Sequence, residues 1–161
     1  VLMFSATITG TIITRYENAF AAVPLLVSFI PMLMDTGGNC GSQSSTLIIR
    51  GLALDEIKFK DIFRVIFKEF RIALLVGIGL AIANGIRIFI MYKDLKMAIV
   101  IALSLSLIVI IAKIIGCTLP LFAKKLHMDP AIMASPLITT VVDTCSIMIY
   151  FSIATRVFTL S

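Results

Sequence analysis

Apolar runs long enough to cross a membrane recur five times along the chain, separated by short polar links. A helix needs roughly 20 apolar residues to cross the hydrocarbon of a bilayer. The pattern therefore predicts an all-α, polytopic membrane protein with five transmembrane helices per chain. The expected spans are 1–14, which is cut short at its start, then 18–50, 71–92, 97–122 and 131–155.

Composition supports the membrane class. Hydrophobic residues make up 60% of the 161 residues and charged residues only 14%, too few charges to cover a soluble domain of this length. The chain opens on Val1 without a basic segment or a small-residue cleavage pattern, so the first span is interpreted as a truncated transmembrane helix and not as a signal peptide. We expect residues 1–161 to be one transmembrane domain cut from a longer protein.

Lysine and arginine are distributed unequally among the four links. The link after the second span carries Arg50, Lys58, Lys60, Arg64, Lys68 and Arg71, and the link after the fourth carries Lys124 and Lys125, whereas the other two hold only Arg15, Lys93 and Lys96. Basic loops stay on the cytoplasmic side, which predicts a cytoplasmic N-terminus and an extracellular C-terminus in the cell membrane. The net charge of +5 is thereby explained by topology, and no nucleic-acid partner is expected.

The long basic link has a helical period of its own. Its apolar positions are Phe59, Ile62, Phe63, Ile66, Phe67 and Phe70, and its polar positions are Lys58, Lys60, Asp61, Arg64, Lys68 and Glu69. This pattern predicts a helix that lies on the membrane surface before turning into the third span. A further lysine, Lys113, falls inside the fourth span, and we expect it to snorkel toward the inner interface.

Small residues repeat every fourth position in the third span. They are Ala73, Gly77, Ala81 and Gly85. Such a stripe lets a neighbouring helix approach closely, so this span is predicted to serve packing.

Two carboxylates lie inside expected spans, where a charge costs several kcal/mol and usually faces water or a partner. In the fifth span, SPLITTVVDTCSIMIY, polar residues recur at intervals of three and four: Pro136, Thr139, Thr140, Asp143, Ser146 and Tyr150. This stripe is typical of a water-lined path, and Pro136 inside a helix would leave the carbonyl one turn earlier unpaired. The alternative is a threonine-rich seam between helices that holds a protonated aspartate.

The second carboxylate stands in PMLMDTGGNCGSQSST, residues 31–46. The polar and glycine positions Asp35, Gly38, Asn39, Ser42, Gln43, Ser45 and Thr46 are predicted to share one helical side. Pro24 and Pro31 are placed to bend or break the helix, and Gly37 and Gly38 predict either an irregular helix or close packing on the fifth span. Carboxylate, amide, hydroxyl and carbonyl oxygens suit a hard cation such as a largely hydrated Mg²⁺.

A protease is a remote alternative, because Asp35, Thr36 and Gly37 spell the DTG of aspartic proteases. That motif belongs to a β-rich fold, and a membrane-embedded aspartyl protease would require GxGD around the second acid, where this chain reads TVVDTC. Three letters therefore carry little weight, and we do not expect an enzyme.

PLLVSFIPMLMDTGGNCGSQSSTLIIRGLALDEI resembles the signature of the MgtE family of magnesium channels, with its GGNxGxQ core and basic exit. The fifth span, DPAIMASPLITTVVDTCSIMIYFSIA, is similar to the last helix of that family. The resemblance implies a homodimer with one pore at the subunit interface, lined by spans two and five and selective for Mg²⁺. It places Asp143, the carbonyl of Thr139 and the amide of Asn39 around the hydrated ion. The other pore-lining candidates are Asp35, Gly38, Ser42, Pro136, Thr140 and Ser146.

The chain departs from the family pattern in two respects. Family members usually carry cytoplasmic N-terminal and CBS domains that regulate the pore, and nothing in residues 1–161 resembles them. Asp35 also replaces what is often a small residue before the double glycine, which adds a carboxylate. A coupled divalent-cation transporter or exchanger on the same spans stays open, since a proline-broken helix serves both a pore and an alternating-access site.

Overall fold

In the computed structural model, five long helices are joined by short links, and the structure describes residues 2–21, 24–133 and 136–158. The helices are α1 (Leu2–Ala21), α2 (Ile30–Ala53), α3 (Ile62–Tyr92), α4 (Leu95–Lys125) and α5 (Pro136–Phe158). Short 3₁₀ segments precede three of them: η1 (Pro24–Phe29), η2 (Phe59–Asp61) and η3 (Pro130–Met133). The described residues contain no strand, so the predicted all-α class is confirmed.

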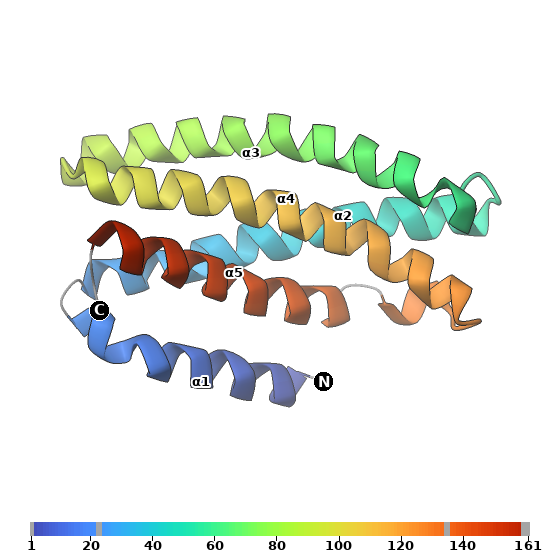
Figure 1. Cartoon of the computed structure of the whole chain (residues 1–161), viewed down its shortest axis with the longest axis horizontal. Helices are drawn as coiled ribbons and strands as arrows, with labels where there is room; N and C mark the ends of the chain where they lie inside the picture. Colours follow the sequence, from blue (N-terminus) through green and yellow to red (C-terminus); the bar gives the residue numbers. More distant parts are fainter. Residues whose placement is uncertain (1, 22–23, 134–135, 159–161) are drawn as a thin grey trace.

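The helices lie side by side along the long axis of the molecule, and helices that follow one another in sequence run in opposite directions (Figure 1). α4 packs against α2, α3 and α5, whereas α1 lies at one edge against α5 and α3 lies at the other edge against α4. The largest buried cluster is centred on Ile101, Leu105 and Ile108 of α4, and it includes Leu33 of α2 and Phe151 of α5. α3 thus packs mainly on α4, which separates most of it from α5.

A tight turn joins α3 to α4. Lys93 adopts a left-handed conformation with φ of 54°, and its N–H donates to the carbonyl of Phe89 at 2.9 Å. Asp94 then caps α4 by accepting a hydrogen bond from the N–H of Met97 at 3.1 Å. This cap fixes the two longest helices as an antiparallel hairpin.

Three helices are long and apolar enough to cross a membrane by length and composition, namely α3, α4 and α5. They correspond to the third, fourth and fifth expected spans. Among the described residues, α1 and α2 do not meet the same criteria. The first two spans therefore stay predictions.

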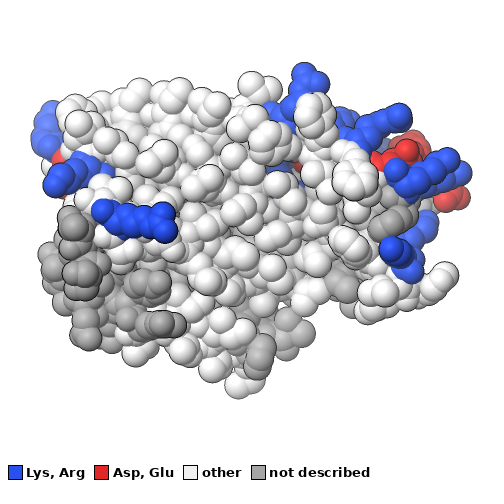
Figure 2. All heavy atoms as spheres, viewed as in Figure 1, with Lys and Arg blue, Asp and Glu red and all other residues white. Residues whose placement is uncertain are grey.

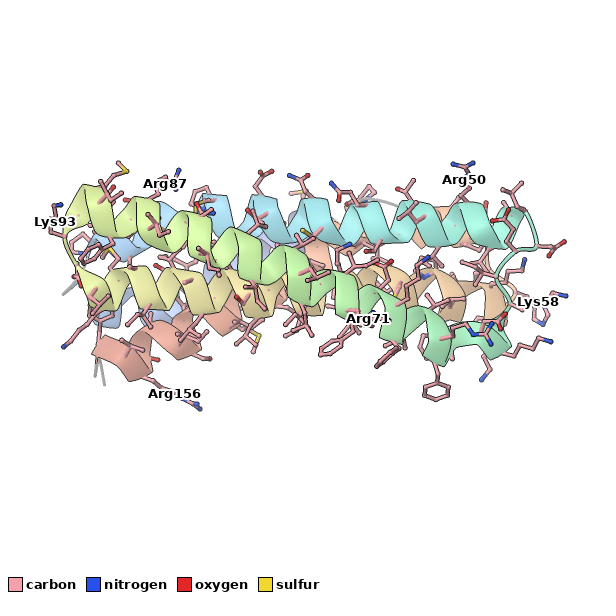
Figure 3. All side chains as sticks on the ribbon, turned by 90° about the horizontal axis from the view of Figure 1, so that it is seen from above. Arg50, Lys58, Arg71, Arg87, Lys93 and Arg156 are labelled. Atoms are coloured by element: carbon pink, nitrogen blue, oxygen red, sulfur yellow. The ribbon has the colours of Figure 1, made fainter. Side chains whose placement is uncertain are left out.

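Charged side chains gather mostly at the two ends of the long axis, with a wide uncharged belt between them (Figure 2). The more strongly charged end holds the α2–α3 link and the α4–α5 link, and we call it the basic end. Arg50 and Lys58 lie toward the basic end, and Arg87, Lys93 and Arg156 lie toward the opposite end (Figure 3). This separation agrees with the grouping of basic links that the sequence predicted.

The expected second span, 18–50, was wrong at its start. Its first residues belong to α1, and η1 begins at Pro24, so that α2 starts only at Ile30 with Pro31 in its first turn. Proline lacks the N–H that a helix interior requires but fits a first turn, where that N–H has no intrahelical partner. Pro24 and Pro31 thus stand where one helix ends and the next begins.

The predicted surface helix is not a separate element. α3 runs without interruption for 31 residues, which is about 46 Å at 1.5 Å per residue and exceeds the roughly 30 Å of bilayer hydrocarbon. Ile62 and Ile66 pack against Ile48 of α2 and Leu121 of α4. The basic segment therefore forms the first turns of the long helix α3.

Pro136 does not interrupt the fifth span as expected, since it is the first residue of α5. At this position its missing N–H leaves no gap in the helical hydrogen bonds. The carbonyl one turn earlier belongs to the η3 segment, outside α5. Among the described residues, the 3₁₀ segment η3 precedes α5, and α5 itself is a regular helix from Pro136 to Phe158.

Candidate functional site

The buried glycines of α2 bring its backbone against α5 and α4. A Cβ on Gly37 would lie 2.8 Å from Cγ2 of Ile108 and 2.9 Å from Oγ of Ser146. A Cβ on Gly41 would lie 3.0 Å from Cγ2 of Ile138, and one on Gly116 would collide with the carbonyl of Gly41. α2 is regular through Gly37 and Gly38, so of the two alternatives close packing is confirmed.

Asp143 lies beside this contact. A Cβ on Gly38 would be 3.7 Å from Oδ1 of Asp143 and 3.4 Å from Cγ2 of Thr139, so the backbone of α2 passes directly alongside the carboxylate. The side chain is half-buried, and in the part of the chain that the structure describes no hydrogen bond or ion pair satisfies it. A carboxylate in this state is available to an external cation.

The polar run of α2 divides between two faces instead of sharing one. Asp35, Asn39 and Gln43 are exposed at four-residue steps, whereas Gly38 and Ser45 are buried inside the bundle. Ser42 lies between these faces, and its buried Oγ has no hydrogen-bond partner among the described residues. The exposed stripe leaves carboxylate and amide oxygens on the outside of a single chain.

The hydroxyl groups of α5 bond to their own backbone. Thr139 and Thr140 donate to the carbonyl of Pro136 at 3.2 and 2.7 Å, and Ser146, buried beneath α2, donates to the carbonyl of Val142 at 2.7 Å. A hydroxyl that donates its proton keeps lone pairs that can accept from water around an ion. Pro136 itself is exposed at the start of α5.

No group of three or more His, Cys, Asp or Glu side chains able to hold a metal occurs in residues 2–21, 24–133 and 136–158. The structure brings together Asp143, Thr139 and Gly38, while Asn39 follows Gly38 on the exposed face of α2.

The sequence interpretation missed a buried charged cluster, which we call the Ser44 triad. Ser44 of α2 donates to Oε2 of Glu69 at 2.7 Å, and Nζ of Lys113 lies 3.1 Å from Oγ of Ser44 and 3.2 Å from Oε2 of Glu69. Ser44, Glu69 and Lys113 are 0%, 5% and 6% exposed. The triad joins α2, α3 and α4 inside the bundle.

Two expectations are corrected by this triad. Lys113 does not snorkel to the interface, and Glu69 does not face away from the bundle, since each satisfies the charge of the other in the interior. One signal was present in the sequence. Glu69 precedes Ala73 by four residues, so it extends the small-residue stripe, of which Ala73 and Gly77 are buried against α4.

Comparison with known proteins identifies the family. The family model described as "Divalent cation transporter" (MgtE) matches residues 30–153. A magnesium transporter MgtE of Bacillus subtilis is 40% identical and one of Thermus thermophilus is 36% identical, each over 154 residues or 96% of this chain. The chain spans 34% of the length of each of these relatives. From the matched residues and these identities, the chain belongs to the MgtE family of divalent cation transporters.

Proposed function

We propose that this chain is the membrane part of a Mg²⁺-selective channel, in which hydrated ions pass between α2 and α5 of two copies. The observation that carries the proposal is Asp143, an unsatisfied carboxylate in a span, held against the backbone of α2. The relatives named as magnesium transporters support Mg²⁺ as the transported ion. The cytosolic regulatory domains expected from the family belong to the rest of the full-length protein.

Mg²⁺ sheds its water reluctantly, so it is best recognised through its hydration shell by a few oxygens. Asp143 supplies charge, while the Thr139 carbonyl and the Asn39 amide orient the bound waters. Conduction needs binding strong enough to admit the ion and weak enough to release it. A single half-buried carboxylate attracts the ion but still lets it leave, whereas an enclosed cage of several acids would bind the ion too tightly to release it.

Two-fold pairing would double these ligands and bring two Asp143 carboxylates toward one axis. We expect a dimer by mass measurement in detergent. Cysteines placed beside Asp143 on α5 should cross-link between copies, whereas a cysteine at Leu75 on the opposite edge of the bundle should not. Monomers with full transport activity would contradict the dimeric pore.

The basic end is proposed to be cytoplasmic, following the positive-inside rule. An inside-negative potential then drives entry with about 2.3 kcal/mol per elementary charge at 100 mV. Liposomes that contain the protein should therefore take up Mg²⁺ faster as the interior is made more negative. A protein that stays assembled but takes up no Mg²⁺ at any potential would refute the proposed function.

Asp35 is expected to attract cations to the outer mouth of the proposed pore. α2 runs from the opposite end toward the basic end, and the exposed Asp35 precedes Asn39 by one turn, so it lies farther out. Salt screens such a field within about 10 Å at 0.1 M. Asp35→Asn should lower Mg²⁺ uptake severalfold at low salt, and the difference should fade at high salt.

The matched control is Glu56→Gln, an exposed acid at the basic end, which should show no such dependence on external salt. A loss in Asp35→Asn that is the same at all salt concentrations would mean direct ligation or a structural role. Uptake equal to that of the unmodified protein at every salt concentration would leave Asp35 without a part in conduction.

A further inference from the structure

A row of cations lies on the outward face of α3 near the basic end. Arg64, Lys68 and Arg71 are all exposed, and they border a hollow of about 350 Å³ whose other walls are Phe67, Ile72 and Leu75. Phe67 and Leu75 are 63% and 77% exposed. The hollow therefore combines an apolar floor with three cations on its border, and beyond Arg71 its walls Ile72 and Leu75 are apolar.

The other face of the same helix fixes this orientation. A Cβ on Gly77 would lie 3.3 Å from the carbonyl of Ser106 in α4, and one on Gly85 would lie 3.5 Å from Cβ of Ala102. Glu69 points inward with them and is 5% exposed. α3 lies at the edge of the bundle, so the hollow faces away from Asp143 and the α2–α5 contact.

No carboxylate of the described residues pairs with these cations. The ion pairs found there are Lys113 with Glu69 and Lys124 with Asp55. Arg64 and Lys68 also border a second hollow, which Glu56, Asp61 and Glu69 line. Glu69 is already paired with Lys113, and among the described residues neither Glu56 nor Asp61 forms an ion pair with these cations. Three neighbouring positive charges repel one another unless an anion lies between them.

The apolar half of the hollow decides which anion fits. A phosphodiester accepts hydrogen bonds from guanidinium and ammonium groups, and arginine binds it through two parallel hydrogen bonds. A free inorganic anion gains nothing from contact with the apolar Ile72 and Leu75, whereas an acyl chain can pack against them. Leu75 lies about 6 Å beyond Arg71 along the helix at 1.5 Å per residue, so the first part of an acyl chain would lie against Ile72 and Leu75 when the phosphate is at the cations.

We propose that this hollow binds one anionic phospholipid, with its phosphate among Arg64, Lys68 and Arg71 and an acyl chain along Ile72 and Leu75. The site is independent of Mg²⁺ conduction. It would be retained in a protein whose pore is inactive, so a failure of one proposal is distinguishable from a failure of the other.

A tryptophan reporter tests the site locally, since this chain contains no tryptophan. Phe67→Trp is placed in the full protein, which is reconstituted with brominated phosphatidylglycerol or brominated phosphatidylcholine. Quenching is measured as the difference from the parent protein. We define the preference as the ratio of quenching by brominated phosphatidylglycerol to quenching by brominated phosphatidylcholine. At position 67 we expect this ratio to be severalfold above one, and inorganic phosphate at millimolar concentration should not reduce it.

The matched control reporter is Phe89→Trp, exposed at the opposite end of α3, where the preference should be near one. Adding R64Q, K68Q and R71Q to Phe67→Trp should abolish the preference, whereas K93Q, K96Q and R156Q remove three charges elsewhere and should preserve it. The single substitution R71Q, which perturbs the fold less, should lower the preference measurably.

Three results would overturn the proposal. The first is a preference near one at position 67 in a protein that is otherwise folded. The second is equal preference at positions 67 and 89, which would mean general attraction to the membrane. The third is loss of preference in inorganic phosphate, which would assign the cations to a free anion.

Discussion

Replacing Asp143 with alanine is expected to lower Mg²⁺ uptake by roughly tenfold or more, while the protein still assembles. The carboxylate is half-buried beside Gly38 and Thr139, and alanine removes the negative charge that attracts the ion at this position. The attraction of a divalent ion to a carboxylate at this depth is on the order of several kcal/mol, and about 1.4 kcal/mol corresponds to a factor of ten. Uptake into liposomes measures the loss.

Asp143→Asn separates charge from shape, because it keeps the volume and the oxygen but removes the negative charge. We expect it to behave nearly as Asp143→Ala does. Ser152→Ala serves as the control on the same helix, since the exposed Ser152 hydroxyl bonds only to the carbonyl of Met148. Normal uptake and ion selectivity in Asp143→Ala would contradict the assigned role.

Lys113→Met is expected to destabilise the bundle by about 3–5 kcal/mol, because it leaves the Glu69 charge buried and unpaired. The Lys113 and Glu69 side chains are each only 7% exposed. The double variant Glu69→Gln with Lys113→Met removes both charges and should be more stable than either single variant. Thermal unfolding of the protein in detergent checks this order.

Lys124→Met is the matched control for that experiment. Lys124 pairs with Asp55 at 4.0 Å and donates to the carbonyl of Leu52 in α2 at 3.1 Å, but the charged side chains are 47% and 86% exposed. An exposed pair contributes about 0–1 kcal/mol, so this variant should unfold nearly as the parent does. Equal destabilisation by Lys113→Met and Lys124→Met would show that the Ser44 triad does not hold α2, α3 and α4 together.

Much of the fold follows from the sequence, because length and hydropathy alone determine where a helix can span. The third, fourth and fifth spans were placed within a few residues at most ends, apart from the early start of α3 at Ile62. Prolines were harder to place. Pro31 and Pro136 each stand in a first turn, a position that cannot be told from a helix interior when apolar residues continue on both sides.

Which face of a membrane helix is buried is less predictable, because lipid and protein interior are equally apolar. Phe63 and Phe67 therefore face outward, although periodicity grouped them with Ile62 and Ile66, which pack inside. Glu69 lies inside because Lys113 of α4 satisfies it, and a contact over 44 positions leaves no local signal.

The sequence predicted only those parts of the candidate site that lie within one chain. As the sequence predicted, the polar stripe of α5 lies against the glycines of α2, with Asp143 and Thr139 beside Gly38. The proposed pairing of Asp143 from two copies would depend on a subunit interface, which the periodicity of one chain does not encode. The ion path therefore stays a proposal based on the residues that face it.

Single-channel recording of the protein in a planar bilayer tests the central claim most directly, since it separates a channel from a coupled transporter. With Mg²⁺ as the only permeant cation, we predict unitary current steps whose amplitude grows with voltage and which disappear in Asp143→Ala. Mg²⁺ flux in liposomes without any resolvable unitary current would contradict the channel and favour a coupled transporter or exchanger.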